Sequence, residues 1–313
     1  MKRAFIFPGQ GSQAVGMGQA LAGAFAEARE VFQEVDEALQ QKLTKLMFEG
    51  PNDDLKLTEN AQPALMAVSM AVIRILEKQG QYKLADNAKF VAGHSLGEYS
   101  ALCAAGTFTL TDTARLLKTR GQAMQKAVPV GIGTMAALIG VDMAQAQDIA
   151  SAAAGREVCT AANDNAPGQV VISGHVAAVD RAMAIAAERG FKRSVKLPVS
   201  APFHCSLMEP AAEIMHEALS RVAMKSPVVP LVANVTAEAV SNVETIRDLL
   251  VQQVTGAVRW RESVLYMKAQ GVEQLVECGS GNVLAGLTKR IDKELPATSL
   301  QTPEDIENFL KAR

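Results

Sequence analysis

Apolar and polar residues follow a regular order along the first part of the chain. Short, mostly apolar runs at 4–7 and 89–92 predict buried strands, and each is followed by apolar positions at helical spacing. The expected helices cover 17–39, 63–77, 96–105 and 112–127. Strands that alternate with helices indicate an α/β unit whose parallel sheet is covered on both faces.

The order changes after the glycine-rich segment 129–133. Strands are expected at 134–139, 158–162, 169–173 and 193–199, with helices at 143–154 and 176–189. This β-α-β-β-α-β order is typical of ferredoxin-like units. We therefore expect an α/β hydrolase-like large subdomain formed by 1–128 and 200–313, with a small ferredoxin-like subdomain inserted at 129–199.

The pattern of the large subdomain resumes after the insertion. Helices are expected at 205–222, 243–254, 261–269 and 283–291, and strands at 228–232 and 274–277. A cap, a proline and two acids at 302–305 predict a last helix.

Composition excludes several classes of protein. The 313 residues are 49% hydrophobic and 20% charged with a net charge of −2, which is typical of a soluble globular protein and gives no reason to expect nucleic acid or an anionic membrane as partner. The apolar runs are too short for a signal peptide or a membrane span. The 4 cysteines lie far apart, without a Cys-x-x-Cys pair, and indicate reduced thiols rather than a zinc site. We expect a cytoplasmic protein without a metal.

The segment Phe90–Glu98 has the organisation of a nucleophile elbow. Gly93-His94-Ser95-Leu96-Gly97 joins a predicted strand to a predicted helix, as that turn requires. Glycine at both ends lets the backbone crowd the turn and hold Ser95 in a strained, exposed conformation. The free N–H groups of the following helix face any negative charge that develops there. Ser95 is therefore the predicted nucleophile.

The loop after the first strand allows two interpretations. Gly9-x-Gly11-x-x-Ala14 could be a dinucleotide fingerprint, but that motif needs an acid at the end of a second strand. The acids at about the right spacing, Glu30, Glu34 and Asp36, lie inside the predicted helix 17–39. We favour a loop that presents polar backbone and amide groups at the end of the strand.

A serine hydroxyl needs a base, and the chain has 4 histidines. His94 adjoins Ser95 and should point away from it across the turn. His175 lies in a turn of the insertion, and His216 lies on a polar helix face. His204, directly after Pro202-Phe203 at the mouth of the large subdomain, is the predicted base.

No acid is obvious as the third member of a triad. The candidates between serine and histidine fit helix caps or turns rather than strand ends; they are Asp112, Asp142, Asp148, Asp164 and Asp180. A backbone carbonyl or an amide could hold the imidazole instead.

Several motifs occur in one order and together resemble those of the malonyl-CoA:acyl-carrier-protein transacylases. They are Phe7-Pro8-Gly9-Gln10-Gly11-Ser12-Gln13, Gly93-His94-Ser95-Leu96-Gly97-Glu98-Tyr99, Arg120-Gly121-x-x-Met124, Ser200-Ala201-Pro202-Phe203-His204 and Glu277-Cys278-Gly279-Ser280-Gly281-x-Val283-Leu284. The resemblance covers essentially the whole chain.

The resemblance implies a mechanism. Malonyl-CoA would acylate Ser95, and the phosphopantetheine thiol of acyl carrier protein would then take the malonyl group, supplying extender units for fatty acid synthesis. His204 would be base and then acid, the backbone N–H groups of Gln10 and Leu96 would form the oxyanion hole, and a backbone carbonyl near Gln253 would orient His204. A monomer without cofactors is implied.

The resemblance also implies substrate contacts. Arg120 would hold the malonyl carboxylate in a two-pronged salt bridge, Phe203 would crowd an α-methyl branch, and Met124 would line the site. The chain departs from the family before Trp260, where members often carry Asn-Pro-Val and this chain has Thr255-Gly256-Ala257-Val258-Arg259-Trp260, so the loop that carries Gln253 differs. Two alternatives to a transacylase stay open. One is an esterase or thioesterase that uses the same serine and histidine, and the other is a non-catalytic module that binds acyl carrier protein.

Overall fold

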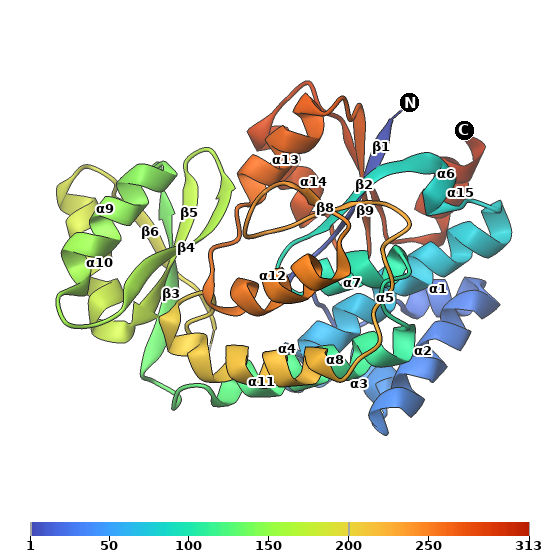
Figure 1. Cartoon of the computed structure of the whole chain (residues 1–313), viewed down its shortest axis with the longest axis horizontal. Helices are drawn as coiled ribbons and strands as arrows, with labels where there is room; N and C mark the ends of the chain where they lie inside the picture. The colour runs from blue at the N-terminus through green and yellow to red at the C-terminus, as the bar shows by residue number, and fades with distance from the viewer. Residues whose placement is uncertain (1, 200, 313) are drawn as a thin grey trace.

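The computed structural model describes residues 2–199 and 201–312, and within them the chain forms two sheets (Figure 1). Three residues lie outside the described part of the chain: Met1, Ser200 and Arg313. Ser200 is the first residue of the predicted segment 200–313. The larger sheet comprises β1 (Arg3–Phe7), β2 (Ala88–Gly93), β7 (Leu231–Val232), β8 (Ala239–Val240), β9 (Gln274–Cys278) and β10 (Ala297–Leu300). Its order is β10-β9-β1-β2-β7-β8, with every pair parallel except β7 and β8.

Helices cover both faces of the larger sheet, because its central strands are apolar on both sides. Phe5 and Phe7 pack into one core and Ala4 and Ile6 into the other. The first core includes residues from α1 (Gln19–Ala24), α2 (Ala26–Leu39), α3 (Leu43–Glu49), α4 (Asn52–Lys56), α5 (Thr58–Gly80), α6 (Leu84–Asn87), α7 (Gly97–Ala104), α8 (Leu110–Lys126), α11 (Glu209–Ser220), α12 (Val243–Thr255) and α15 (Pro303–Lys311). The second includes residues from α13 (Trp260–Ala269) and α14 (Val283–Ile291).

The smaller sheet is antiparallel and has its own core. It comprises β3 (Gly133–Ile139), β4 (Cys159–Ala166), β5 (Gln169–His175) and β6 (Arg193–Lys196) in the order β4-β5-β3-β6. Helices α9 (Met143–Ala154) and α10 (Val176–Glu188) pack on it, at the left of Figure 1. The predicted fold class, a parallel-sheet unit with a β-α-β-β-α-β insertion, is confirmed.

Strand β4 joins the smaller sheet to the rest of the chain. Asn163 pairs with Val258 in a β-bridge, and the buried Asp164 forms an ion pair of 2.8 Å with Arg261. The smaller sheet therefore rests against the segment that runs from α12 into α13.

Two predicted elements were wrong in extent. The single helix expected at 17–39 is two helices, because Phe25 adopts an extended conformation and packs against the core between them. The strand expected at 228–232 is only Leu231–Val232, since Pro230 has no N–H to donate to a neighbouring strand.

Three further boundaries differ. The helix expected at 205–222 starts at Glu209, with Pro210 in its first turn, after a 3-10 turn at Ser206–Met208. The helix expected at 63–77 spans Thr58–Gly80 and contains Pro63 inside it. The strand expected at 193–199 ends at Lys196. Short elements such as α4, β8 and β10 gave no clear periodicity and were missed.

The nucleophile elbow is held by close backbone contacts. A Cβ atom on Gly93 would lie 1.9 Å from the carbonyl of Gly97, and one on Gly97 would lie 2.2 Å from the carbonyl oxygen of Phe7. Ser95 has φ of 52°, a left-handed conformation that costs a non-glycine residue about 1–3 kcal/mol. The two glycines therefore pack the turn against the end of β1 and impose this conformation on Ser95.

The variant Gly97→Ala tests this constraint. The added methyl group must displace backbone, so we expect the free energy of unfolding to fall by about 3 kcal/mol or more. Gly286→Ala is the matched control, because nothing lies within 4 Å of its Cβ position in α14. Chemical denaturation of both variants measures the difference, and equal stabilities would contradict the close contact.

Candidate active site

Ser95 and His204 form a hydrogen-bonded pair, although Ser95 lies before the smaller sheet in the chain and His204 after it. Ser95 Oγ lies 2.8 Å from His204 Nε2, and His204 is 4% exposed. Like Ser95, His204 has a left-handed backbone conformation, with φ of 58°. Both side chains of the pair are thus presented from backbone conformations that only the surrounding structure can hold.

The end of helix α12 holds the other side of the imidazole. His204 Nδ1 lies 2.8 Å from the carbonyl oxygen of Gln253 and 3.1 Å from that of Gly256. The last carbonyls of a helix lack partners within it, so α12, which ends at Thr255, leaves that of Gln253 available, and Gly256 follows the helix as its C-cap. Because both partners only accept, Nδ1 carries the proton and Nε2 presents its lone pair to Ser95.

Burial keeps the His204 side chain neutral. Loss of hydration and the nearby charge of Arg120 lower the pKa of His204 to about 3, although the two carbonyls act in the opposite direction. At pH 7 the imidazole is therefore free to accept the serine proton, and the carbonyls can stabilise the imidazolium that results.

Arg120 points its guanidinium at the nucleophile. Helix α8 places the side chain at 1% exposure, with Nη2 3.1 Å from Ser95 Oγ. Its other partners are the amide oxygens of Gln62, at 2.8 Å, and Gln253, at 2.7 Å. Nε has no partner among the described residues, and none of its hydrogen-bond acceptors is a carboxylate. A buried cation with only neutral partners can still bind an anion.

The side chain of Gln253 connects the separate parts of the site. While Oε1 accepts from Arg120, Nε2 lies 2.9 Å from the carbonyl oxygen of Ser95 and 2.5 Å from Glu98 Oε2. Together with its backbone carbonyl on His204, this one residue touches the nucleophile turn, the base and the arginine. The prediction for Gln253 concerned its carbonyl only, and its side-chain role was missed.

Asn234, two residues after the end of β7, supports the elbow from the neighbouring turn. Its Oδ1 accepts from the N–H of Ser95 at 2.9 Å, and its Nδ2 donates to the carbonyl of Gly93 at 2.7 Å. The structure thus adds Gln62, Glu98 and Asn234 to the predicted residues. In the sequence, each of the three is only a polar residue inside an apolar helix or near the end of a strand. Such positions are too common to identify these residues as part of a site.

The predicted oxyanion-hole residues lie on the two loops that meet at the elbow. The N–H of His94 donates to the carbonyl of Phe7 at 3.0 Å, which brings the loop of Gln10 beside Leu96. Among the described residues, the backbone N–H groups of Gln10 and Leu96 have no acceptor. The Gln10 side chain turns to Thr58, at 3.2 Å.

Phe203 and Met124 lie at the edges of this network. Phe203, 8% exposed, directly precedes His204. Met124 lies one turn after Arg120 on α8, and its sulfur is 3.7 Å from Gln62 Nε2.

The remaining histidines and acids have other partners. His94 Nε2 lies 2.8 Å from Asn165 Oδ1, away from Ser95, while His216 is exposed and His175 accepts from the N–H of Val158. Asp142 caps α9, and Asp164 pairs with Arg261. The third member of the constellation is therefore a backbone carbonyl.

Known proteins resemble the chain over most of its length. The acyl transferase domain model matches residues 4–295. The chain belongs to the acyl transferase family. It is 47% identical over 300 residues to the malonyl CoA-acyl carrier protein transacylase of Escherichia coli (strain K12), with 96% of each chain covered.

Solved structures show the same relationship for this acyltransferase. The acyl-carrier-protein-S-malonyltransferase from Bartonella henselae superposes with a TM-score of 0.97 at 57% identity, covering 100% of this chain and 99% of that chain. A type II PKS acyl-carrier protein in complex with its malonyl-transacylase gives a TM-score of 0.96 at 40% identity, with both chains covered to 100%.

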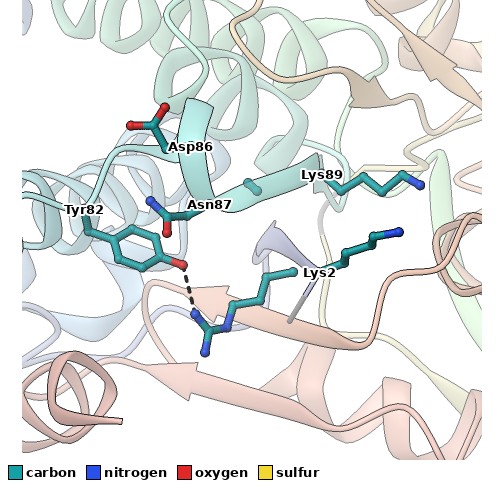
Figure 2. Close-up of a pocket in the computed structure, with 7 residues that line it drawn as sticks. Lys2, Tyr82, Asp86, Asn87 and Lys89 are labelled. Carbon is teal, nitrogen blue, oxygen red and sulfur yellow. Dashed lines mark hydrogen bonds between the residues drawn. The ribbon is translucent and has the colours of Figure 1, made fainter. Parts of the chain in front are cut away.

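A separate pocket lies at the opposite end of the sheet. It encloses about 530 Å³ where β1 and β2 begin, and is lined by Lys2, Arg3, Tyr82 and Lys89 among others (Figure 2). Arg3 Nη1 donates to Tyr82 Oη there, at 3.3 Å. The carboxyl ends of parallel strands are the usual place for α/β active sites, and Ser95 lies at that end.

Within residues 2–199 and 201–312, no group of three or more metal-ligating side chains is close enough to hold an ion. No helix in this part of the chain is long and apolar enough to cross a membrane.

The lowered pKa of His204 predicts its titration in the resting acyltransferase. The imidazole should stay neutral from pH 8 to below pH 5 and take a proton only as the pH approaches about 3. Ring ¹⁵N shifts, assigned by the signal that His204→Ala removes, measure this. An inflection between pH 5 and 8 would contradict the account.

Proposed function

We propose that this acyltransferase moves a malonyl group from malonyl-CoA to the phosphopantetheine thiol of acyl carrier protein through an ester of Ser95. The observation that carries the proposal is Arg120, whose buried guanidinium has no carboxylate partner and lies 3.1 Å from the nucleophile. An acyl group attached to Ser95 and ending in a carboxylate supplies an anion that can contact the guanidinium directly. Arginine can hold that carboxylate at two points, which lysine cannot do.

Acylation begins at the Ser95–His204 pair. His204 Nε2 takes the hydroxyl proton as Oγ attacks the thioester carbonyl, and the Gln253 and Gly256 carbonyls stabilise the imidazolium. The tetrahedral oxyanion forms between the N–H groups of Gln10 and Leu96. When the C–S bond breaks, His204 returns the proton to the sulfur of CoA.

Transfer to the carrier protein reverses the same steps. His204 accepts the proton of the phosphopantetheine thiol, the sulfur attacks the ester, and Ser95 regains its proton as the C–O bond breaks. The malonyl-transacylase solved with an acyl-carrier protein supports the choice of partner. Burial of Arg120 and His204 limits water near the ester, which favours transfer over hydrolysis.

The proposal extends to organisation and location. We assign 1–128 and 200–313 to one subdomain and 129–199 to the other. Two contacts bring the inserted subdomain beside the site: His94 bonds to Asn165, and Gly133 packs against Pro202. A monomer without cofactors meets all the chemistry above. Four buried, unpaired cysteines fit the reducing cytoplasm.

Arg120→Ala tests the carboxylate contact. We expect kcat/KM for malonyl-CoA to fall by about 10²-fold or more, as for loss of a charged hydrogen-bonded pair, while acetyl transfer is kept or improved. Arg120→Lys should recover only part of the loss. The exposed Arg115 on the same helix provides the control Arg115→Ala. Equal losses for malonyl and acetyl groups would contradict the proposal.

Phe203→Ala tests selectivity for the unbranched acyl group. Removing the ring beside His204 should reduce discrimination against methylmalonyl-CoA by about tenfold, since packing against one methyl group contributes roughly 1–3 kcal/mol. The ratio of kcat/KM for the two thioesters measures it. An unchanged ratio would show that another residue excludes the branch.

A further inference from the structure

Glu98 is a buried carboxyl group whose purpose the transfer reaction leaves open. It lies on α7, three residues after the nucleophile, and is 1% exposed. Its Oε2 accepts from Gln253 Nε2 at 2.5 Å and from the N–H of Asn234 at 3.4 Å. Its Oε1 is buried and has no hydrogen-bond partner among the described residues. Such an oxygen is costly to keep as part of an anion.

The charged group that faces Glu98 is Arg120. The amide of Gln253 lies between them, because its Oε1 accepts from Arg120 Nη2 while its Nε2 donates to Glu98. Arg120 comes from α8, and the titratable neighbour on Glu98's own helix is Tyr99, whose ring lies under the guanidinium at 5.6 Å. The groups from α12 and from the turn after β7, Gln253 and Asn234, are neutral amides.

This arrangement gives the empty site one buried cation and one buried carboxyl group. If Arg120 binds the malonyl carboxylate, as the proposed function requires, the same enclosed region would hold two anions against one cation. Burial makes an uncompensated charge expensive, and a carboxyl group near a second anion becomes harder to ionise.

We propose that Glu98 is the counter-charge of Arg120 in the empty enzyme and takes up one proton from solvent when a malonyl carboxylate binds Arg120. The inference rests on the proposed function and adds a positioning residue to it. The proton goes to Oε1 of Glu98, which accepts no hydrogen bond. Oε2 of Glu98 therefore continues to accept from Gln253 Nε2, and Gln253 Oε1 stays directed at Arg120.

The resting properties of Glu98 place this exchange in an accessible range. Burial raises its pKa to about 7, against the smaller opposing effects of Gln253, Asn234 and Arg120. At pH 7.5 the group is mostly ionised and can take up a proton, whereas at pH 6 it is mostly protonated already. The sign follows: malonyl binding weakens as the pH rises above about 7, by up to about tenfold per pH unit. An acetyl group has no carboxylate and produces no such dependence.

Proton uptake during acylation is the direct test. Wild-type enzyme is mixed with malonyl-CoA in weakly buffered solution with a pH indicator, and the acyl-enzyme formed is counted by intact mass. The transfer itself is proton-neutral, apart from ionisation of the released CoA thiol, which an equal amount of free CoA corrects. We expect roughly 0.7 proton per malonyl-enzyme at pH 7.5 and roughly 0.1 at pH 6.

The variant Glu98→Gln and the substrate acetyl-CoA are the controls. Glutamine keeps an acceptor for Gln253 Nε2 and cannot titrate. The malonyl-enzyme of this variant should therefore form without proton uptake, and its kcat/KM for malonyl-CoA should not decline between pH 7 and 8. Acetyl-enzyme formation in the wild type should also show no uptake. If the variant does not fold, the malonyl and acetyl reactions of the wild type at both pH values decide.

The possible failures are distinguishable. The wild type could form the full amount of malonyl-enzyme with the same proton uptake as in the acetyl reaction or in Glu98→Gln. That result would overturn the role of Glu98 and leave the proposed function standing. Absence of any malonyl adduct would overturn the proposed function, and this inference with it.

Discussion

The burial of the Arg120 charge beside Ser95 is the constraint on which the site depends. A guanidinium at 1% exposure would cost several kcal/mol if nothing compensated it. Two amide oxygens and the serine hydroxyl satisfy part of its hydrogen-bonding capacity, and a carboxyl group beyond Gln253 supplies opposite charge at a distance. In the reaction proposed above, an acyl group that brings its own carboxylate would complete this balance of charge.

The rest of the architecture delivers the partners of that charge. The end of β2 and the glycines of the elbow fix Ser95, the turn after β7 supplies Asn234, and the end of α12 supplies both the carbonyls for His204 and the amide of Gln253. Because helix α12 provides an acceptor where many serine enzymes use an aspartate, the imidazole is oriented without adding a negative charge. An ionised carboxylate at that position would compete with the proposed substrate carboxylate for Arg120.

Much of this could be predicted from the sequence, for identifiable reasons. The elbow has a local signature, since a strand, two glycines and a helix lie within a few residues, and the β-α-β-β-α-β order is visible as a change of rhythm. Local patterns could not show that Phe25 interrupts a helix or that Pro230 shortens a strand, because tertiary packing and sheet pairing decide both. Arg120 and Gln253 were identified through resemblance to a family. Glu98, Gln62 and Asn234 were missed, since their contacts span 19 to 155 residues of sequence.

The most direct measurement is the intact mass of the protein after brief mixing with malonyl-CoA, with Ser95→Ala alongside. The account predicts a single malonyl adduct on the wild type only, stable in buffer and removed when phosphopantetheinylated acyl carrier protein is added. An adduct that water removes as fast as the carrier protein would indicate a hydrolase. An equal adduct on Ser95→Ala, or none on the wild type, would contradict the central claim that Ser95 carries the malonyl group between two thiols.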